Sequence, residues 1–260
     1  GGKKAILVLG SDEKVVLGDE AEETLLAGNT TVKKEGNTLV YDRQKNGEGE
    51  EEYNRLITPR GGEYAVVLAD GTKVWVNAES ELRYPVQFSG TERKVYLKGE
   101  AYFAVTKQVT KPFIVCLDQA EITVLGTSFN VKAYPEDENV VTTLVSGKVS
   151  QEYTKSEEEV ILNPSDQAVY TKSSGELKVE RVDVNEVICW KNGRMILKNR
   201  SLKEIFCELA RWYDFEVEYR KKGVEETRFY VNMDRYDDIE TVLDKLQKTN
   251  GVKFMFYGRK

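Results

Sequence analysis

The sequence predicts a mainly β protein, in which a large all-β domain of stacked antiparallel hairpins precedes a small α+β domain. Two observations predict the first domain. From about residue 4 to 182 the apolar residues fall in short β-branched runs, and turn signals separate these runs. The second domain is predicted from one observation: helical patterns with capping residues begin only beyond Gly193. The hairpins would bury one another's apolar faces, either as a sandwich or as a β-helix-like stack.

The boundary between the two domains is expected within Asp183–Gly193, where the composition changes. The all-β domain then spans 1–188, with an extra hairpin unit over 1–50 and a core over 56–182. The α+β (βαβ-βαβ) domain spans 189–260.

The core strands are predicted from runs rich in Val, Ile, Tyr, Phe and Thr. They are Tyr64–Leu68, Lys73–Val76, Arg93–Leu97, Ala101–Val105, Phe113–Leu117, Glu121–Leu125, Phe129–Tyr134 and Val140–Val145. Asp70-Gly71 and Lys98-Gly99 are predicted turns, in which glycine is free to take a positive φ.

The first domain contains an internal sequence repeat at an offset of 59 residues. Leu7–Leu9 and Lys14–Leu17 match Val66–Leu68 and Lys73–Val76, and a tight polar turn joins each pair of strands. The match predicts two hairpins of one type in a repeated β architecture. Chance similarity between two short hairpins is the alternative. The Gly/Glu-rich stretch Asn46–Glu52 is predicted to be a solvated loop between the copies.

The C-terminal domain is predicted to follow the order β-α-β twice. Ser201 and Glu204 form a capping box that begins its first helix, and Asp237 with Glu240 caps its second. The apolar faces of these helices are Leu202, Ile205, Phe206, Leu209, Ala210 and Tyr213, and Ile239, Val242, Leu243 and Leu246. The predicted strands are Arg194–Lys198, Phe215–Tyr219, Arg228–Asn232 and Val252–Tyr257.

Composition excludes several classes of function. The 38 basic and 44 acidic residues give a net charge of −6, which is not that of a globally basic nucleic-acid binder. The chain has no histidine, which excludes Ser-His-Asp and Cys-His catalysis and any His-ligated metal. Cys116, Cys189 and Cys207 are too few for a four-thiolate zinc site and are interpreted as small buried side chains. A Cys189–Cys207 bond stays open, and we expect no cofactor and no metal.

Charge is unevenly distributed along the chain. Residues 190–260 carry a net +4 and residues 1–189 a net −10, so the two parts are expected to attract each other. A βαββαβ order with aromatics on a strand also occurs in RNA-recognition folds. However, Arg228–Val231 lacks the glycine-spaced aromatics that stack bases. No nucleic-acid partner is expected.

Acidic residues are the remaining candidates for catalysis. The runs Glu48–Glu52, Glu136–Glu138 and Glu157–Glu159 lie in predicted loops, whereas a glycosidase needs two carboxylates that face each other across a cleft. Asp70 and Glu100 lie at predicted turns and could converge. Glu136–Glu138 could hold calcium but lacks the spacing of a dedicated loop. Solvated charge and turn chemistry is the favoured interpretation, so no catalytic residue is assigned.

The start of the chain gives no sign of a membrane span. Its apolar run, Ala5–Leu9, is far shorter than the roughly 18 residues that a span needs. The chain begins Gly1-Gly2 without methionine, which we interpret as a cut from a longer protein, with any anchor or targeting segment upstream.

A series of sequence blocks accompanies the predicted core strands. The blocks are Thr58–Gly62, Leu68–Ser80, Arg83–Pro85, Arg93–Phe103, Lys111–Val115 and Val124–Val131. In this order they resemble the FecR family, the membrane-anchored sigma-factor regulators of Gram-negative bacteria. The first hairpin copy resembles the extra N-terminal unit of Bacteroidetes members. The tail from Trp190 to Tyr257 is similar to their C-terminal domain, which itself resembles the short N-terminal domain of secretins and TonB-dependent transducers.

The resemblance implies a signalling adaptor and not an enzyme: the periplasmic part of a single-pass inner-membrane anti-sigma factor. In the family, this part binds the N-terminal signalling domain of an outer-membrane TonB-dependent transducer. Substrate loading of the transducer leads to cleavage by periplasmic and intramembrane proteases. Cleavage releases an extracytoplasmic-function sigma factor, which is bound by a cytoplasmic segment upstream. Whether the signal is a glycan or a siderophore stays open, as does an inhibitory or assisting role.

An edge strand is the predicted partner site. With only two helices, the C-terminal sheet should keep an open edge, which a transducer strand could complete by β-augmentation. The candidate edge consists of Arg228, Phe229, Tyr230, Val231 and Asn232, with Phe229 and Val231 on one face and Tyr230 on the other. Packing of Tyr230 against its own β-domain is the alternative.

Two other functions stay open. One is a carbohydrate-binding or hydrolysing envelope β-protein, in which exposed Trp and Tyr side chains would stack on sugar rings. The other is a structural envelope module without a signalling role.

Overall fold

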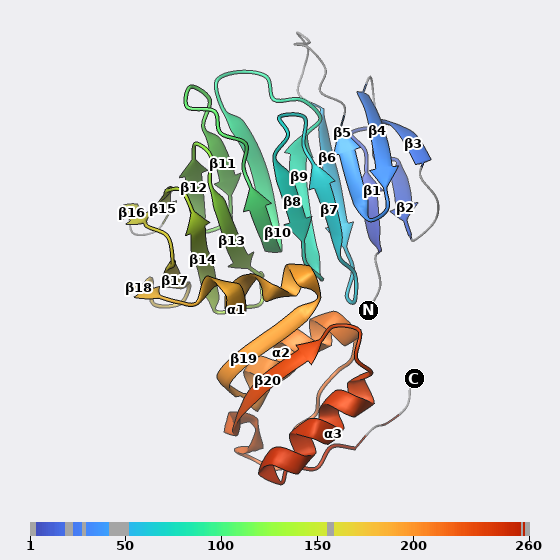
Figure 1. The fold of residues 1–260 in the computed structure, drawn as a ribbon, viewed down its shortest axis with the longest axis vertical. Coiled ribbons are helices and arrows are strands. Elements are labelled where there is room, and N and C mark those ends of the chain that lie inside the picture. Colours follow the sequence, from blue (N-terminus) through green and yellow to red (C-terminus); the bar gives the residue numbers. More distant parts are fainter. Residues whose placement is uncertain are drawn as a thin grey trace.

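The computed structural model describes residues 4–18, 23–27, 30–41, 52–154, 159–255 and 257 (Figure 1). Within these residues, strands β1 to β18 form two β layers that share strand β10 and pack as a sandwich. A C-terminal module of two strands and two longer helices, residues 194–257, lies against one end of the sandwich. The predicted mainly β fold with a following α+β part is confirmed.

The first layer has the strand order β2-β1-β6-β9-β10-β11-β12-β15-β16. Its strands are β1 (Ala5–Val8), β2 (Lys14–Leu17), β6 (Tyr53–Thr58), β9 (Ser80–Pro85), β10 (Arg93–Ala104), β11 (Phe113–Cys116), β12 (Ala120–Val124), β15 (Val149–Tyr153) and β16 (Glu159–Leu162).

The second layer has the strand order β3-β4-β5-β7-β8-β10-β13-β14-β17-β18. Its strands besides β10 are β3 (Glu23–Ala27), β4 (Thr30–Glu35), β5 (Thr38–Tyr41), β7 (Tyr64–Val67), β8 (Lys73–Val76), β13 (Ser128–Ala133), β14 (Asn139–Ser146), β17 (Asp166–Thr171) and β18 (Leu177–Arg181).

Beyond β10 the hairpins alternate between the layers. Hairpins β11–β12 and β15–β16 lie in the first layer, and hairpins β13–β14 and β17–β18 lie in the second. This alternation is the stacking of hairpins that the sequence predicts. Two neighbouring pairs, β10 with β11 and β5 with β7, are parallel, which the sequence did not indicate.

Strand β10 replaces two predicted strands. The sequence predicts Arg93–Leu97 and Ala101–Val105 with a turn at Gly99, but one strand runs from Arg93 to Ala104. Its first half pairs with β9 and β11, and its second half with β8 and β13. Gly99 takes a φ of +97°, so the predicted left-handed conformation is correct, but it carries the strand from one layer into the other without reversing it.

The internal repeat is confirmed by the register of the paired strands. Strand β1 pairs with β2 through Leu7 and Val15, and strand β7 pairs with β8 through Val66 and Val74, which is the same pairing displaced by 59 residues. The turns also agree. Leu9 N–H donates to Glu13 O, and Leu68 N–H donates to Thr72 O. The two copies nevertheless lie in different layers. Most of the predicted loop Asn46–Glu52 lies outside the described residues.

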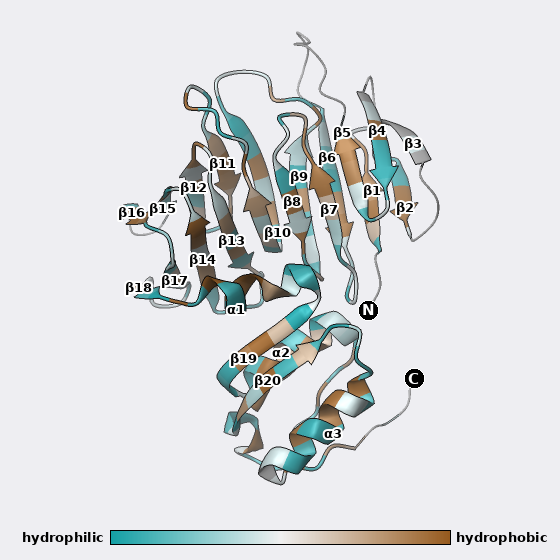
Figure 2. Cartoon of the chain, in the orientation of Figure 1, coloured by the Kyte–Doolittle hydropathy of each residue, from teal (hydrophilic) through white to brown (hydrophobic). Residues whose placement is uncertain are grey.

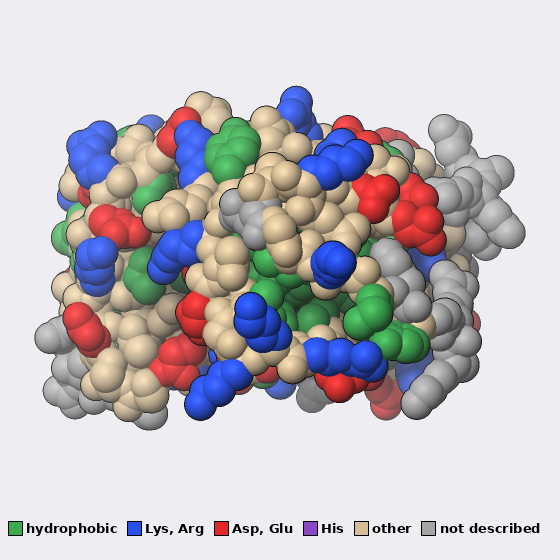
Figure 3. Space-filling view, turned by 90° about the horizontal axis from the view of Figure 1, so that it is seen from below, with side chains coloured by type: hydrophobic (Ala, Val, Ile, Leu, Met, Phe, Trp, Pro, Cys, Tyr) green, Lys and Arg blue, Asp and Glu red, His purple; other side chains and the backbone are tan. Residues whose placement is uncertain are grey.

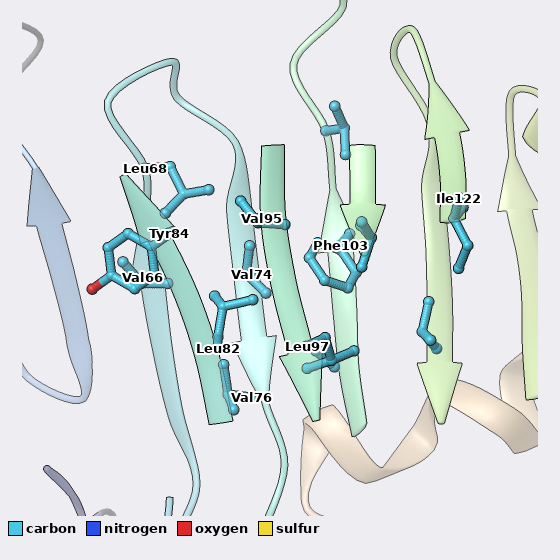
Figure 4. Packing of buried hydrophobic residues seen from close by; sticks show 14 of the residues in the cluster. Val66, Leu68, Val74, Val76, Leu82, Tyr84, Val95, Leu97, Phe103 and Ile122 are labelled. Atoms are coloured by element: carbon cyan, nitrogen blue, oxygen red, sulfur yellow. The ribbon is translucent and has the colours of Figure 1, made fainter. Parts of the chain in front are cut away.

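The core lies between the two layers, where buried aliphatic and aromatic side chains meet (Figure 4). The ring of Phe103 stacks on Phe129, with centroids 5.1 Å apart, and meets Phe113 of the other layer edge-on at 6.2 Å. Along most strands apolar and polar residues alternate (Figure 2), as expected for sheets with one buried face. Burial of these rings stabilises the sandwich by about 2 kcal/mol per side chain.

The connection to the module is helical and was not predicted. Helix α1 (Val184–Ile188) and the 3-10 turn η1 (Cys189–Asn192) follow β18. The module then consists of β19 (Arg194–Ser201), α2 (Leu202–Tyr213), the turn η2 (Val224–Glu226), β20 (Arg228–Asp234) and α3 (Ile239–Asn250). Strands β19 and β20 pair antiparallel, with Met195 opposite Met233.

Two predicted strands of the module are wrong. The structure assigns no strand at Phe215–Tyr219 or in the described part of Val252–Tyr257. Their apolar side chains face the helix instead, because Phe215 and Phe254 both meet the Phe206 ring edge-on at 6.0 and 5.4 Å. The alternating apolar residues that predict these two strands therefore pack on α2 instead, and the segments form no β-ladder.

The predicted helices are confirmed, with two differences. Ser201 and Glu204 form the reciprocal capping box of α2. The buried face of α2 includes Arg211 and Trp212, which the predicted face omitted, whereas Ala210 and Tyr213 of the predicted face are only half-buried. Helix α3 begins after Asp238 and not after Asp237.

Replacing Gly99 by alanine should lower the free energy of unfolding by more than about 2 kcal/mol. A Cβ atom at this position would lie 2.2 Å from Ser80 Oγ and 2.7 Å from Ser80 Cα, and a positive φ costs a side chain about 1–2 kcal/mol. Gly90→Ala is the control, since Gly90 also has a positive φ but has open space around it. Equal urea midpoints for the two variants would contradict the tight packing at β10.

Candidate interaction site

Strand β20 presents alternate residues to the core of the module and to solvent. Phe229 and Val231 are 4% exposed, while Tyr230 is 59% exposed and its neighbours Arg228 and Asn232 are exposed as well. The predicted alternation is therefore correct. Tyr230 does not pack against the sandwich, which removes the alternative interpretation of this side chain.

The far edge of β20 is open in the part of the chain that the structure describes, where β19 is its one ladder partner. An open hollow of about 470 Å³ lies at the start of β20, lined by Asn199 of the paired strand β19, by Arg228, Phe229 and Tyr230, and by Thr249 of α3. The hollow brings the end of α3 next to the candidate edge. The edge thus offers backbone hydrogen-bonding groups and an aromatic ring together.

A second cluster lies where the sandwich meets the module, and we call it the junction network: Asn77, Glu100, Asn130, Trp190 and Arg235. Glu100 is 6% exposed and accepts hydrogen bonds from Asn77 Nδ2 at 2.8 Å and Asn130 Nδ2 at 2.9 Å. Asn77 follows β8, Glu100 lies in β10 and Asn130 lies in β13, so three neighbouring strands of the second layer bring these side chains together.

Two donors from outside the sandwich complete the junction network. Trp190 Nε1 donates to Asn130 Oδ1 at 3.0 Å, and Arg235 Nη1 donates to Asn77 Oδ1 at 3.1 Å. The Arg235 guanidinium is 1% exposed and also binds Gly62 O and Glu63, and it lies 4.6 Å from the centre of the Trp212 ring. The junction is therefore buried and polar at the same time.

Arg211 of α2 forms the centre of a second group of charges at the junction. Its guanidinium stacks on the ring of Tyr134 at 3.7 Å and pairs with Glu136, Asp137 and Glu79 of the sandwich. In return, Lys132 of β13 pairs with Glu208 of α2. The Arg211 pairs have the sense that the opposite net charges of the two parts predict, whereas the Lys132–Glu208 pair has the reverse sense.

The carboxylates of the junction have shifted pKa values. Burial would raise the pKa of Glu208 and Glu136, but Lys132 and Arg211 outweigh it for Glu208, and Arg211 does so for Glu136, so both lie below 4.5. Burial raises the pKa of Glu100 above 4.5, against the opposing effects of Lys132 and the two asparagine amides.

The acidic candidates for catalysis do not converge. Asp70 lies in a turn and binds Arg93 at 2.7 Å, whereas Glu100 lies within β10 and not at a turn, contrary to the prediction. Glu136 and Asp137 bind Arg211, and Glu138 accepts from Ser173 N–H. The other two runs lie largely outside the described residues. Over the described ranges, no group of three or more acidic or cysteine side chains is arranged to hold a metal ion.

The tryptophans offer no platform for a sugar ring. Trp190 and Trp212 are buried, and the ring of Trp75 lies beneath Lys73 and Lys191, at 4.6 and 5.1 Å from its centre. The cysteines are free thiols, Cys116 being buried, Cys189 half-buried and Cys207 exposed. The interpretation of Cys207 as a buried side chain was therefore wrong, and no Cys189–Cys207 bond is present.

Sequence reasoning missed most of the junction residues, Arg211 and Arg235 among them. Each stands next to or among aromatic residues, Arg211 before Trp212 and Arg235 before Tyr236. An arginine beside aromatics in an otherwise apolar helix face is the signal that could have found Arg211.

Comparison with known proteins finds similar solved structures. Two crystal structures of a "putative anti-sigma factor from Parabacteroides distasonis", at 1.65 and 2.50 Å resolution, are similar to it. Each has 31% sequence identity and a TM-score of 0.73; the matches cover 78% and 79% of this chain and 95% of theirs. No curated protein matches the sequence.

The chain belongs to the FecR family. The family model "FecR protein" matches residues 54–150, and the model "FecR, C-terminal" matches residues 194–260. The resemblance inferred from the sequence blocks is thereby confirmed, and the protein is an anti-sigma factor or sigma-factor regulator of the FecR type. No helix in the described ranges is long and apolar enough to cross a membrane.

Replacing Arg211 by glutamine should lower the free energy of unfolding by about 3 kcal/mol, because it removes the buried guanidinium that joins the module to the carboxylates of the sandwich. Arg220→Gln is the control, since Arg220 is exposed and its guanidinium lies 5.1 Å from the centre of the Tyr257 ring. Urea denaturation measures both. A loss of less than about 1 kcal/mol for Arg211→Gln would show that the stacked guanidinium contributes no more than a surface ion pair.

Acidification below pH 4.5 should weaken the junction. The lowered pKa values of Glu136 and Glu208 mean that their stabilisation is fully present above 4.5 and is lost as the pH falls through those lowered values. Glu100 acts in the opposite sense, since protonation relieves part of its burial cost. Glu208→Gln should therefore flatten the fall in urea midpoint between pH 6 and about pH 3. An unchanged slope would contradict the assignment.

Proposed function

We propose that this chain is the periplasmic part of an inner-membrane FecR-type anti-sigma factor, and that it receives its signal from the N-terminal signalling domain of an outer-membrane TonB-dependent transducer. The sigma factor would be bound by a cytoplasmic segment beyond this chain. Periplasmic and intramembrane proteases would release it once the transducer is loaded. Membership of the FecR family supports this proposal.

The observation that carries the proposed docking site is the open edge of β20. A partner strand could add to this edge, and the exposed ring of Tyr230 would lie beside the added backbone. Viewed from the side of the module, Lys and Arg side chains surround a central apolar patch (Figure 3). The net charge of +4 over residues 190–260 favours a partner surface with acidic residues.

We further propose that the chain divides functionally at 188/189, into an all-β part, with its extra unit over 1–50 and core over 56–182, and a C-terminal part that carries the docking site. The helical connection α1–η1 spans this boundary.

Tyr230→Ala should weaken binding of the transducer's isolated signalling domain about tenfold or more, because an exposed aromatic at the centre of an interface contributes strongly to affinity. The probe is the isolated signalling domain of a TonB-dependent transducer, and calorimetry with residues 1–260 measures its binding. Tyr257→Ala is the matched control, since Tyr257 is 69% exposed and is not among the residues that line the hollow.

Binding that is unchanged in Tyr230→Ala would exclude this strand as the docking site. Loss of binding in both variants would point to a different face of the module.

A further inference from the structure

The hydrogen bonds of the junction network all point one way. A carboxylate can only accept, so the amide NH₂ groups of Asn77 and Asn130 must face Glu100. Their carbonyl oxygens are then turned away from Glu100, toward the module. Those two oxygens accept from Arg235 and Trp190, whose guanidinium and indole N–H groups can only donate.

Neither asparagine can reverse its amide without loss. Both side chains are 2% exposed, so a reversed amide would place N–H against N–H with no water to compensate. Asn77 Oδ1 also accepts from the N–H of Ala78 at 2.9 Å, which a reversed amide could not do. The orientation of each amide is therefore set at one end by Glu100 and used at the other end by Trp190 of the connection η1 or by Arg235 of the module.

The backbone of Glu100 is held as firmly as its side chain. Its N–H donates to Ser80 Oγ at 2.9 Å, and its carbonyl oxygen accepts from Asn77 N–H at 2.9 Å. Gly99, immediately before it, allows Ser80 to approach this closely. The carboxylate thus lies at a fixed point between the two amides.

We propose that Glu100 is the positioning residue that docks the C-terminal module: its carboxylate orients the Asn77 and Asn130 amides, so that the Arg235 and Trp190 contacts form or break together. Glu100 touches neither of those two residues through any hydrogen bond described above, so the coupling passes through the asparagines. This inference does not rest on the proposed function, because it concerns the docking of the module and not its partner.

A double-mutant cycle on the full chain tests the coupling. Glu100→Gln places an NH₂ group where one asparagine requires an acceptor, so one amide has to turn and its outward oxygen is lost. Trp190→Phe removes the indole N–H. Trp190→Phe should raise the equilibrium constant of unfolding in both backgrounds. We expect the fold-increase to be about three times smaller in the Glu100→Gln background than in the wild type. The loss of ring area on Trp190→Phe is the same in both backgrounds and cancels.

Phe206→Leu is the matched control, since Phe206 is buried in the module and contacts Phe215 and Phe254. Its effect should be the same with and without Glu100→Gln. A cycle in which Trp190→Phe is also additive with Glu100→Gln would overturn the proposal. So would equal coupling of Glu100→Gln to both substitutions, since that would indicate only a general loosening.

Hydrogen exchange in the wild-type chain gives a test that needs no variant. If the network opens as one unit, the Trp190 indole N–H and the side-chain amides of Asn77 and Asn130 should exchange at rates reporting a common opening equilibrium, after correction for intrinsic rates. Opening equilibria that differ by more than about tenfold between the Asn77 and Asn130 arms would overturn the proposal.

Discussion

A charged group cut off from water needs hydrogen-bond donors from the protein, and Glu100 imposes that condition at the point where the sandwich meets the module. Strands β8, β10 and β13 must lie side by side for Asn77 and Asn130 to reach it. On their far sides the two amide oxygens accept from Trp190 and Arg235 of the segment after β18, and Asn77 Oδ1 accepts from the Ala78 N–H as well. The arrangement of three strands and the docking of the module thus follow from the requirements of one buried carboxylate.

The sequence predicts well those features that neighbouring residues determine. The capping box of Ser201 and Glu204, the hairpin at Asp70-Gly71 and the left-handed Gly99 are all local, and the structure has them. It fails where the determining contact is distant. Arg235 reaches Asn77 across 158 residues and Gly62 across 173, and no local pattern separates such an arginine from a solvated one. The candidate edge strand could be predicted because its alternation is a local pattern. The asparagines and the glutamate of the junction network lie within the blocks that resemble the FecR family, but nothing in the sequence explains why those residues stand there.

Strand β20 links the two sites described above. Tyr230, at the open edge, and Arg235, in the junction network, belong to one nearly continuous extended segment, and Arg235 N–H is further tied to Gly193 O. A strand that added to this edge would therefore act on a segment whose end is anchored in the sandwich. The register of this small sheet shifts at a bulge between Leu197 and Arg200 of β19, so the irregularity lies in β19 and not in β20.

The repeated hairpin register has a consequence for how such a chain can vary in length. The same hairpin, with the same register and turn, occurs in both layers. Each such hairpin is therefore a structural unit whose turn, register and buried face are specified by its own residues. The outermost strands, β16 and β18 at one end and β2 and β3 at the other, each have a single ladder neighbour within the described residues. The addition or removal of a whole hairpin at one of these ends would therefore leave β8, β10 and β13, and with them the junction with the module, in place.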